Sequence, residues 1–353
     1  MKNTINIILR TTSPWHVAFP DNQSKAHDGM SLTQSKKVSQ KPVPCFLANG
    51  IRGRLRRAIA DRIIDVMTDV QGPIPSNVYI GMKTGSSSAQ PDKSHLSVEE
   101  LVRSQGHVYM GLFGGGSRTL KSRYKVSDIN PILEHTVNAG IFPMPKEKLQ
   151  PIVDSLMIKS GEDMVHLEPY RLLEKRFFFK VDDIARGVKM DKVIKAVDGG
   201  EDGVAKYLTG NQASDKARKG DETGNTKKTS VANMLSIECI ATGTMMHFSV
   251  TVDPDVNEAQ FGALLLGLKD IFDENYIGGW GRAGFGQFEV VSMGIDIDNF
   301  DIHETVEEKL YSEKHGFTYH NFSDAVKNSI NEAETAIDEV SKDEMISYFT
   351  NLA

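Results

Sequence analysis

The sequence predicts an α+β fold built on a split βαβ, or ferredoxin-like, core. Three observations predict this class: alternating apolar residues near the N-terminus, two helical stripes of apolar residues, and a second group of alternating segments around residue 250. The best-defined elements follow one another as strand, helix, strand, strand, helix, strand, which is the order of a split βαβ core. The long segment Gln71–Thr229 separates the first helix from the second strand, so this core is expected to carry large insertions.

The first strand and the first helix have clear periodicities. Apolar residues alternate over Asn3–Thr11, which predicts a strand. Residues 12–44 are polar and contain four prolines, which predicts a long loop. Asn49 is then predicted to cap a helix that runs to about Val70 and buries one apolar stripe.

The middle of the chain has weaker patterns. Ser97–Gln105 is expected to be helical, Gly111–Arg118 to form a glycine-rich turn, and the aromatic segment Lys175–Ile184 to form a strand. Gly199–Lys228 is rich in glycine, lysine and aspartate and poor in large apolar residues. Such a composition predicts a mobile segment.

The last third of the chain has sharper patterns again. It predicts, in order, a hairpin of Met234–Ala241 and Met245–Asp253 with its turn at Thr242–Gly243, a helix over Asn257–Phe272, a glycine-rich loop over Gly278–Gly286, a strand over Gln287–Ile295 and an acidic, helical tail from about Asp301. The helix and the final strand complete the split βαβ order.

Composition excludes several classes of protein. A chain of 353 residues with 39% hydrophobic and 25% charged residues is typical of a soluble protein with a sizeable core. The longest apolar run, Phe261–Leu268, is too short to span a membrane. Two cysteines, Cys45 and Cys239, exclude a disulfide scaffold and a cysteine-built zinc site. We therefore expect a cytoplasmic protein with no membrane partner.

The net charge of −6 conceals a strong asymmetry. Asp296–Ala353 holds 14 acidic and 4 basic residues, whereas residues 1–130 hold 18 basic and 9 acidic ones. A basic N-terminal part beside an acidic tail leaves nucleic-acid binding open, although ordinary surface variation would also give this pattern.

The arginines near the start of the first helix favour a phosphate-rich partner. Arg52, Arg54, Arg56 and Arg57 fall where the helix dipole is already positive, and exposed cations there cost about 0.3–1 kcal/mol each. Bound phosphate would reverse that sign, because guanidinium forks match phosphate oxygens. The alternative is a surface cluster paired with acidic residues further along the helix, Asp61 and Asp65.

A second glycine-rich pattern has the wrong context for dinucleotide binding. Gly279–Gly284 matches GxGxxG, but a helix precedes it and a strand follows, which is the reverse of the nucleotide-binding order. The glycines instead allow close backbone approach, with Arg282 available for phosphate, or form a plain tight connection. Other basic groups lie elsewhere, and the predicted RNA-binding residues are Lys36, Lys37, Arg52, Arg54, Arg56, Arg57, Arg118, Lys121, Arg186, Gly281, Arg282 and Gly284.

Signals of catalysis are scarce. The sequence contains no HExxH, GxSxG, Walker A or EF-hand pattern. Asp21 and Asp28 on the long N-terminal loop are weak candidates for acid–base work on RNA. The carboxylates Asp296, Asp298 and Asp301 could hold a hard cation, but a solvated strand end is the favoured interpretation. We expect no metal, no cofactor and no catalytic residue, and a small-molecule nucleotide enzyme stays an alternative.

Several motifs together resemble the RAMP superfamily of CRISPR-associated proteins. Ile277–Gly286 resembles its C-terminal glycine-rich loop, and Ala48–Arg56 resembles the basic helix start of its backbone subunits. Leu112-Phe113-Gly114 is similar to a short motif of the superfamily, and Ser236–Asp253 to the hairpin before its second helix. The order of these pieces is more specific than each alone.

The resemblance implies a modified RNA-recognition-like palm with insertions, in four segments. These are a palm of residues 1–70 and 231–296, an inserted helical and irregular region over 71–180, a thumb-like insertion over 181–230, and an acidic helical extension over 297–353. It implies many copies bound head to tail along one crRNA in a helical filament, which presents the guide to target nucleic acid in defence against mobile genetic elements. Other effector subunits and a helicase are the implied protein partners.

Departures from the superfamily pattern refine the class. Members that cut target RNA carry an aspartate after a glycine-rich stretch in the loop behind the first strand, and Trp15–Asp21 lacks those glycines. The Asn49-Gly50 pair and the acidic extension are most similar to the type IV backbone subunit, which implies a non-catalytic scaffold. The alternative is a type III-like backbone subunit that cleaves target RNA with Asp21 or Asp28.

Overall fold

The computed structural model describes residues 3–18, 30–86, 97–117, 119–160, 163–180, 233–312 and 316–349. The chain divides into two compact units. Unit 1 contains Met1–Pro20, Leu32–Glu174 and Cys239–Ala353, and unit 2 contains Asp21–Ser31 and Lys175–Glu238. The predicted mobile segment Gly199–Lys228 lies outside the described residues.

Unit 1 is built on an antiparallel sheet with strand order β13-β12-β1-β11-β5, and β6 also pairs with β11. The strands are β1 (Thr4–Thr11), β5 (Tyr124–Val126), β6 (Asn130–Pro131), β11 (Met245–Val252), β12 (Phe288–Ile297) and β13 (Ile302–Val306). Helices cover this sheet, so the predicted α+β class is confirmed. The central positions of β12, β1 and β11 match those of the fourth, first and third strands of a ferredoxin-like sheet.

Residues of β1 alternate between two cores. Ile5, Ile7 and Leu9 enter the main core, which the sheet shares with the long helices. Ile8 points to the opposite face, where it packs in a smaller core with Leu149 and other residues of the inserted region. The alternation that predicted the strand therefore reflects a sheet that is covered on both faces.

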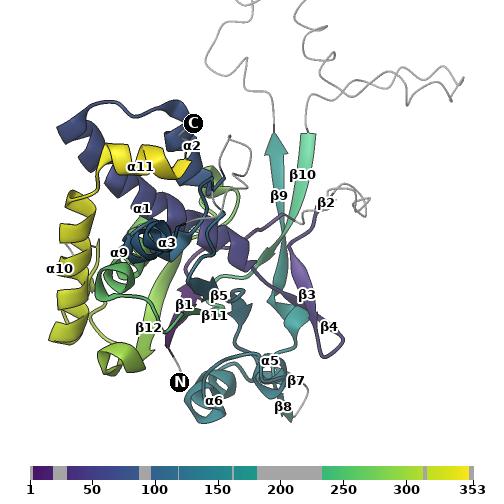
Figure 1. Ribbon diagram of the computed structural model, residues 1–353. Helices are drawn as coiled ribbons and strands as arrows, with labels where there is room; N and C mark the ends of the chain where they lie inside the picture. The colour runs from purple at the N-terminus through teal and green to yellow at the C-terminus, as the bar shows by residue number, and fades with distance from the viewer. Residues whose placement is uncertain are drawn as a thin grey trace, which may run out of the picture. The chain divides into compact units, whose positions relative to one another are not determined.

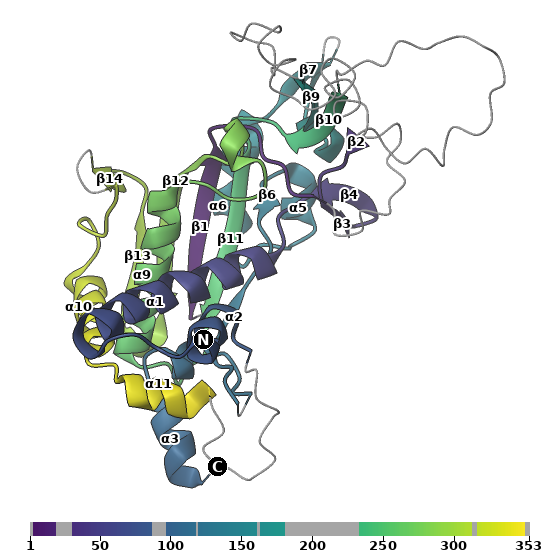
Figure 2. The ribbon, with the colours of Figure 1, turned by 90° about the horizontal axis from the view of Figure 1, so that it is seen from above.

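Two long helices cover one face of the sheet. Helix α1 (Ala48–Gln71) crosses the strands, as Figure 2 shows, and α9 (Glu258–Glu274) packs beside it. Asn257 caps α9, since its side chain accepts from Gln260 N at 2.9 Å. Both helices were predicted, because each buries one continuous apolar stripe.

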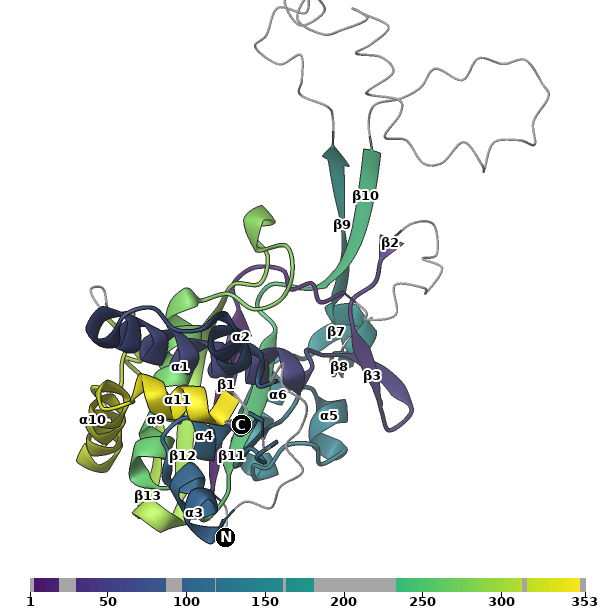
Figure 3. The same ribbon diagram turned by 45° about the horizontal axis from the view of Figure 1, so that its top comes forward.

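Two details of the predicted core are wrong. Asn49 does not cap α1, because the helix already begins at Ala48 with Leu47 at the N-cap position. The predicted hairpin of Met234–Ala241 and Met245–Asp253 does not form either. Strand β10 (Asn233–Ile240) pairs with β9 (Leu173–Lys180) and β2 (Met30–Ser31), while β5 and β6 occupy the β11 edge where the hairpin would have placed β10. Figure 3 shows β9 and β10 side by side.

Shorter elements fill the insertions. The predicted loop over 12–44 contains a hairpin of β3 (Ser35–Val38) and β4 (Lys41–Pro44). The remaining elements are α2 (Ser76–Thr84), α3 (Val98–Gly106), α4 (Met110–Phe113), α5 (Glu134–Asn138), α6 (Lys146–Ser155), β7 (Ile158–Ser160), β8 (Asp163–Val165), β14 (Tyr311–Ser312), β15 (Gly316–Phe317) and the 3-10 turns Pro169–Leu172, Gly281–Ala283 and Asp298–Phe300. Within the described ranges, no helix is long and apolar enough to cross a membrane.

The acidic tail belongs to the main core. Its strand β13 extends the sheet, and α10 (Asp324–Asp338) packs against α9, beside which Figure 1 shows it. Helix α11 (Lys342–Phe349) packs against α2. Val326, Ala333 and Met345 of these helices are fully buried. The charged residues of the tail therefore form the outer faces of helices whose inner faces complete the core.

Candidate nucleic-acid interface

The start of α1 is already occupied by a carboxylate. Asp128 Oδ1 accepts from Ala48 N at 2.9 Å, and Asp128 Oδ2 pairs with Lys36 Nζ at 2.7 Å. An acidic side chain therefore caps the positive end of the helix from a distant segment. Lys36, a predicted RNA-binding residue, is balanced by the same carboxylate, whereas its neighbour Lys37 is exposed.

Arg54 ties α1 to the beginning of the glycine-rich loop. Its guanidinium donates to the Tyr276 carbonyl and pairs with Glu274, and it lies 5.4 Å from the centre of the Tyr276 ring. The side chain is only 15% exposed, and this burial lowers the pKa of Arg54. A desolvated guanidinium with three partners fixes the place where α9 gives way to the loop.

Arg56 ties α1 to a second glycine-rich turn. It donates to the carbonyls of Phe113 and Gly114, the latter at 3.1 Å, and lies over the Phe113 ring. Gly114, Gly115 and Gly116 follow with positive φ angles, so the chain turns back sharply here. Arg56 thus satisfies carbonyls that the end of α4 leaves without helical partners.

Arg52 and Arg57 face solvent from the same turns of the helix. Arg52 Nη2 lies 3.5 Å from Ser122 Oγ, which brings exposed Lys121 to the beginning of α1. Burial, together with the charge of Arg57, lowers the pKa of Lys83. Asp61 pairs with Lys83. Among the described residues, no ion pair joins Arg52, Arg56 or Arg57 to Asp61 or Asp65, the carboxylates of the alternative interpretation.

The glycine-rich loop over 277–286 is fixed by main-chain bonds. Gly279 N donates to His16 O at 3.0 Å and Gly286 N donates to Pro14 O at 2.9 Å, so the loop lies along the segment that follows β1. At Gly281, a Cβ would lie 2.5 Å from the Tyr276 ring, and Gly284 has a φ of 79°. Arg282, between these glycines, is exposed.

Helix α9 before this loop and strand β12 after it confirm the order that excludes a dinucleotide fingerprint. Tyr276, Glu274 and Asp128 were not predicted to take part in this region. Tyr276 and Glu274 contact Arg54, and Asp128 contacts the start of α1. Each contact joins residues that are far apart in sequence, so no local sequence pattern indicates it.

Several predicted residues lie outside the described part of the chain. These are the RNA-binding candidates Arg118 and Arg186 and the weak catalytic candidates Asp21 and Asp28.

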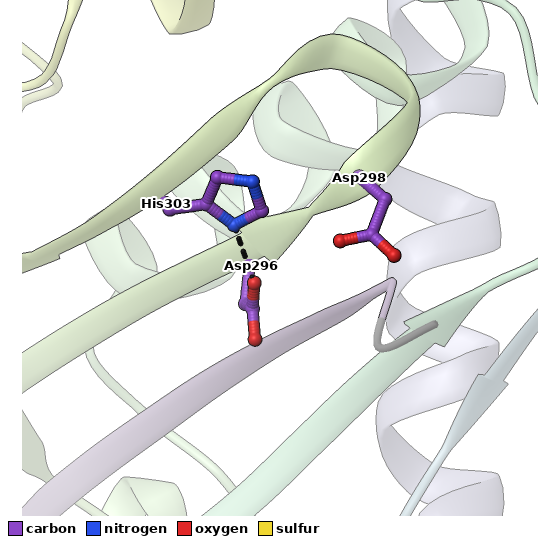
Figure 4. Close-up of side chains that lie close together, drawn as sticks. All are labelled: Asp296, Asp298 and His303. Atoms are coloured by element: carbon purple, nitrogen blue, oxygen red, sulfur yellow. Dashed lines mark hydrogen bonds and ion pairs between the residues drawn. The ribbon is translucent and has the colours of Figure 1, made fainter.

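A histidine and two aspartates gather at the turn between β12 and β13 (Figure 4). His303 Nδ1 lies 2.6 Å from Asp296 Oδ1, with Asp298 beside them, because Asp296 and His303 are cross-strand partners. The hydrogen bond to Asp296 is the main cause that raises the pKa of His303. All three side chains are at least partly exposed, and Asp296 and His303 are bonded to each other.

Comparison with known proteins gives structural similarities only. No protein-family model matches the sequence, and no curated protein matches it. Among solved structures, the chain is similar to a chain of a type IV-B CRISPR complex, with 13% identity, a TM-score of 0.42, and coverage of 87% of this chain and 95% of that one. It is also similar to a chain in the cryo-EM structure of the type III-B Cmr-beta complex bound to cognate target RNA, with 10% identity, a TM-score of 0.37, and coverage of 86% of this chain and 60% of that one.

Proposed function

We propose that this chain binds the phosphate backbone of a guide RNA as a repeated subunit of a CRISPR effector complex. The observation that carries the proposal is that two of the four arginines of α1 bind other parts of the chain and two are exposed. Arg54 and Arg56 hold two glycine-rich loops against the helix, while Arg52 and Arg57 present their guanidinium groups to solvent beside them. The sequence motifs at these positions are those that resemble the RAMP superfamily.

Such a surface suits RNA of any sequence. Guanidinium groups bind phosphate oxygens in a bidentate manner, and contacts to phosphate fix the position of a strand without reading its bases. The bases of the guide then stay available for pairing, which supplies the sequence specificity. Phosphate near Arg52 would also offset the unfavourable placement of cations in the first turns of α1.

The finer assignment follows the sequence motifs. We propose a type IV-like backbone subunit that binds copies of itself head to tail along the crRNA, together with other effector subunits and a helicase. In this proposal the subunit is a scaffold without catalytic residues.

Reversing the exposed charges is expected to release RNA. The double variant Arg52→Glu, Arg57→Glu, co-expressed with a guide RNA, should lose at least about tenfold in RNA affinity, because two phosphate contacts become repulsive. The slope of log affinity against log salt concentration should also become shallower, by the contribution of roughly two phosphate contacts. The absorbance ratio at 260 and 280 nm of the purified complex and a salt titration by fluorescence anisotropy measure both effects.

The matched control is Lys146→Glu, Lys148→Glu, which reverses two exposed charges on one turn of α6. This variant should keep its RNA. If the Arg52, Arg57 double variant retains RNA normally, the proposal that these two arginines bind RNA is wrong.

The absence of catalysis is tested with target RNA. We expect the purified complex to leave a complementary target RNA intact in the presence of magnesium, since the loop that follows β1 lacks the glycines found in cutting members. Gel analysis of a labelled target measures this. Periodic cleavage that Asp21→Ala or Asp28→Ala abolishes would replace the scaffold with the type III-like alternative.

A further inference from the structure

The two tryptophans of this chain differ sharply. Trp15 is fully buried, and its Nε1 donates to Gln287 O at 2.8 Å. Trp280, in the glycine-rich loop, is 39% exposed. A single exposed aromatic residue is common on protein surfaces, so the exposure of Trp280 gains meaning only from its backbone and its neighbours.

The backbone of Trp280 is left-handed. Its φ is 65° and its ψ is 23°, a conformation that bulky residues rarely adopt. Gly279 and Gly281 flank it, and a third glycine at position 280 would adopt this conformation without strain. Residues held in such conformations persist where the surroundings fix them, and they gather at binding sites.

The surroundings of Trp280 do fix it. Its carbonyl accepts from Ala283 N at 2.8 Å, and the residue before it is bonded through Gly279 N to His16 O. Below the loop, the Tyr276 hydroxyl donates to Gly278 O at 2.5 Å, and Arg54 holds the Tyr276 carbonyl. The indole is therefore carried by a rigid turn, which reduces the entropy lost when a ligand stacks on it.

A cation accompanies the indole. Arg282 lies two residues further along in the same 3-10 turn and is exposed. Proteins that bind single-stranded nucleic acid combine aromatic faces, on which bases stack, with cations that contact the phosphates. The loop offers both groups within three residues.

We propose that the Trp280 indole stacks on a nucleobase of the bound RNA while Arg282 contacts a neighbouring phosphate. This inference rests on the proposed function, but it gives the loop a task that α1 does not have. Arg52 and Arg57 contact phosphate only, whereas Trp280 contacts the face of a base. Stacking uses the π-face and leaves the hydrogen-bonding edge of that base free.

Fluorescence tests the stacking directly, because Trp15 is fully buried whereas Trp280 is partly exposed. The probes are a single-stranded RNA of mixed sequence and the same strand with abasic sites, both added to RNA-free full-length protein. The intact strand should quench the fluorescence and bind about tenfold more tightly than the abasic strand, a typical effect of one stacked base. Equal quenching and equal affinity for both strands would overturn the proposal.

The variant Trp280→Gly separates stacking from packing. It should remove the preference for the intact strand, leave affinity for the abasic strand unchanged, and leave the melting temperature equal or higher, since glycine relieves the left-handed conformation. A lower melting temperature with an unchanged preference would instead make Trp280 a packing residue and overturn the inference. A fluorescence shift that depends on protein concentration without RNA would assign Trp280 to contact between copies, with the same consequence.

Failure of this inference differs from failure of the proposed function. If wild-type protein binds both strands equally and Arg52→Glu, Arg57→Glu abolishes that binding, the phosphate-binding surface stands and only the stacking is wrong. If wild-type protein binds neither strand, both proposals fall.

Discussion

Replacing Gly262 with alanine is expected to lower the free energy of unfolding by about 2–3 kcal/mol, within the range for overpacked cores. Gly262 lies in α9 where α10 crosses it, and a Cβ built there would lie 1.7 Å from the carbonyl oxygen of Ser329. A main-chain carbonyl within a helix cannot rotate away as a side chain can. The two helices would have to separate, which opens the core that α10 shares with α9.

The matched control for this substitution is Gly106→Ala. Gly106 is also a helical glycine, at the end of α3, but a Cβ there meets nothing within 4 Å. Alanine at 106 should therefore leave stability unchanged or raise it by about 0.5–1 kcal/mol, because alanine loses less conformational entropy on folding. Chemical unfolding measures both values. Equal stability of the two variants would contradict the close approach of α9 and α10.

The acidic tail is part of the folded core and is not a separate extension. Its negative charge sets it apart in sequence, and residues 297–353 were predicted to form a helical extension. In the structure β13 pairs with β12, and α10 meets α9 at Gly262. Removing the tail would expose the buried faces of α9 and of β12, so loss of RNA binding by a truncated chain would report unfolding as well as any direct role.

Local periodicity predicted the elements of the core but not all of their pairing. β1, α1, α9 and β12 each carry a pattern that one element alone explains. β10 also alternates, yet its partners are β9 and β2 instead of β11. Pairing depends on which distant strands are available, and the pattern within a strand is the same for each choice of neighbour.

The candidate interface shows the same limit at the level of single residues. Sequence placed all four arginines of α1 together as phosphate ligands, and nothing in their spacing distinguishes them. The structure separates them because the partners of Arg54 and Arg56 are main-chain carbonyls of Tyr276, Phe113 and Gly114. Carbonyls have no signature in a sequence. The capping carboxylate of Asp128 is likewise eighty residues away from the helix that it caps.

Acid is expected to destabilise this protein from about pH 6.5 downward, because two histidines are buried in neutral form. Burial lowers the pKa of His247 to about 3, and its ring packs edge-on against Phe142 with Nε2 3.2 Å from Asn6 Oδ1. Burial also lowers the pKa of His107, against the opposing charge of Glu344. Its Nδ1 accepts from the main-chain N–H groups of Tyr109 and Met110, so a proton on Nδ1 would displace both bonds.

The sign follows from proton uptake on unfolding. Above pH 6.5 both states hold these rings neutral, so the lowered pKa values cost nothing. Below pH 6.5 the unfolded chain binds protons that the folded chain does not, and stability falls by about 1.4 kcal/mol per pH unit for each fully neutral histidine. His247 alone should therefore remove about 2–3 kcal/mol between pH 6.5 and 4.5, and its contribution levels off only near pH 3.

His247→Gln isolates this contribution, because glutamine keeps a donor for Asn6 but cannot take up the proton. Glutamine lacks the ring that packs on Phe142, so the variant should be less stable than wild type at pH 8. That deficit should shrink by about 2–3 kcal/mol as the pH falls to 4.5, because the variant has lost one source of acid sensitivity while carboxylates act equally on both proteins. Urea unfolding at four pH values measures the difference. Exposed His320→Gln is the control and should follow wild type throughout; parallel curves for His247→Gln and wild type would mean that His247 titrates normally in the folded chain.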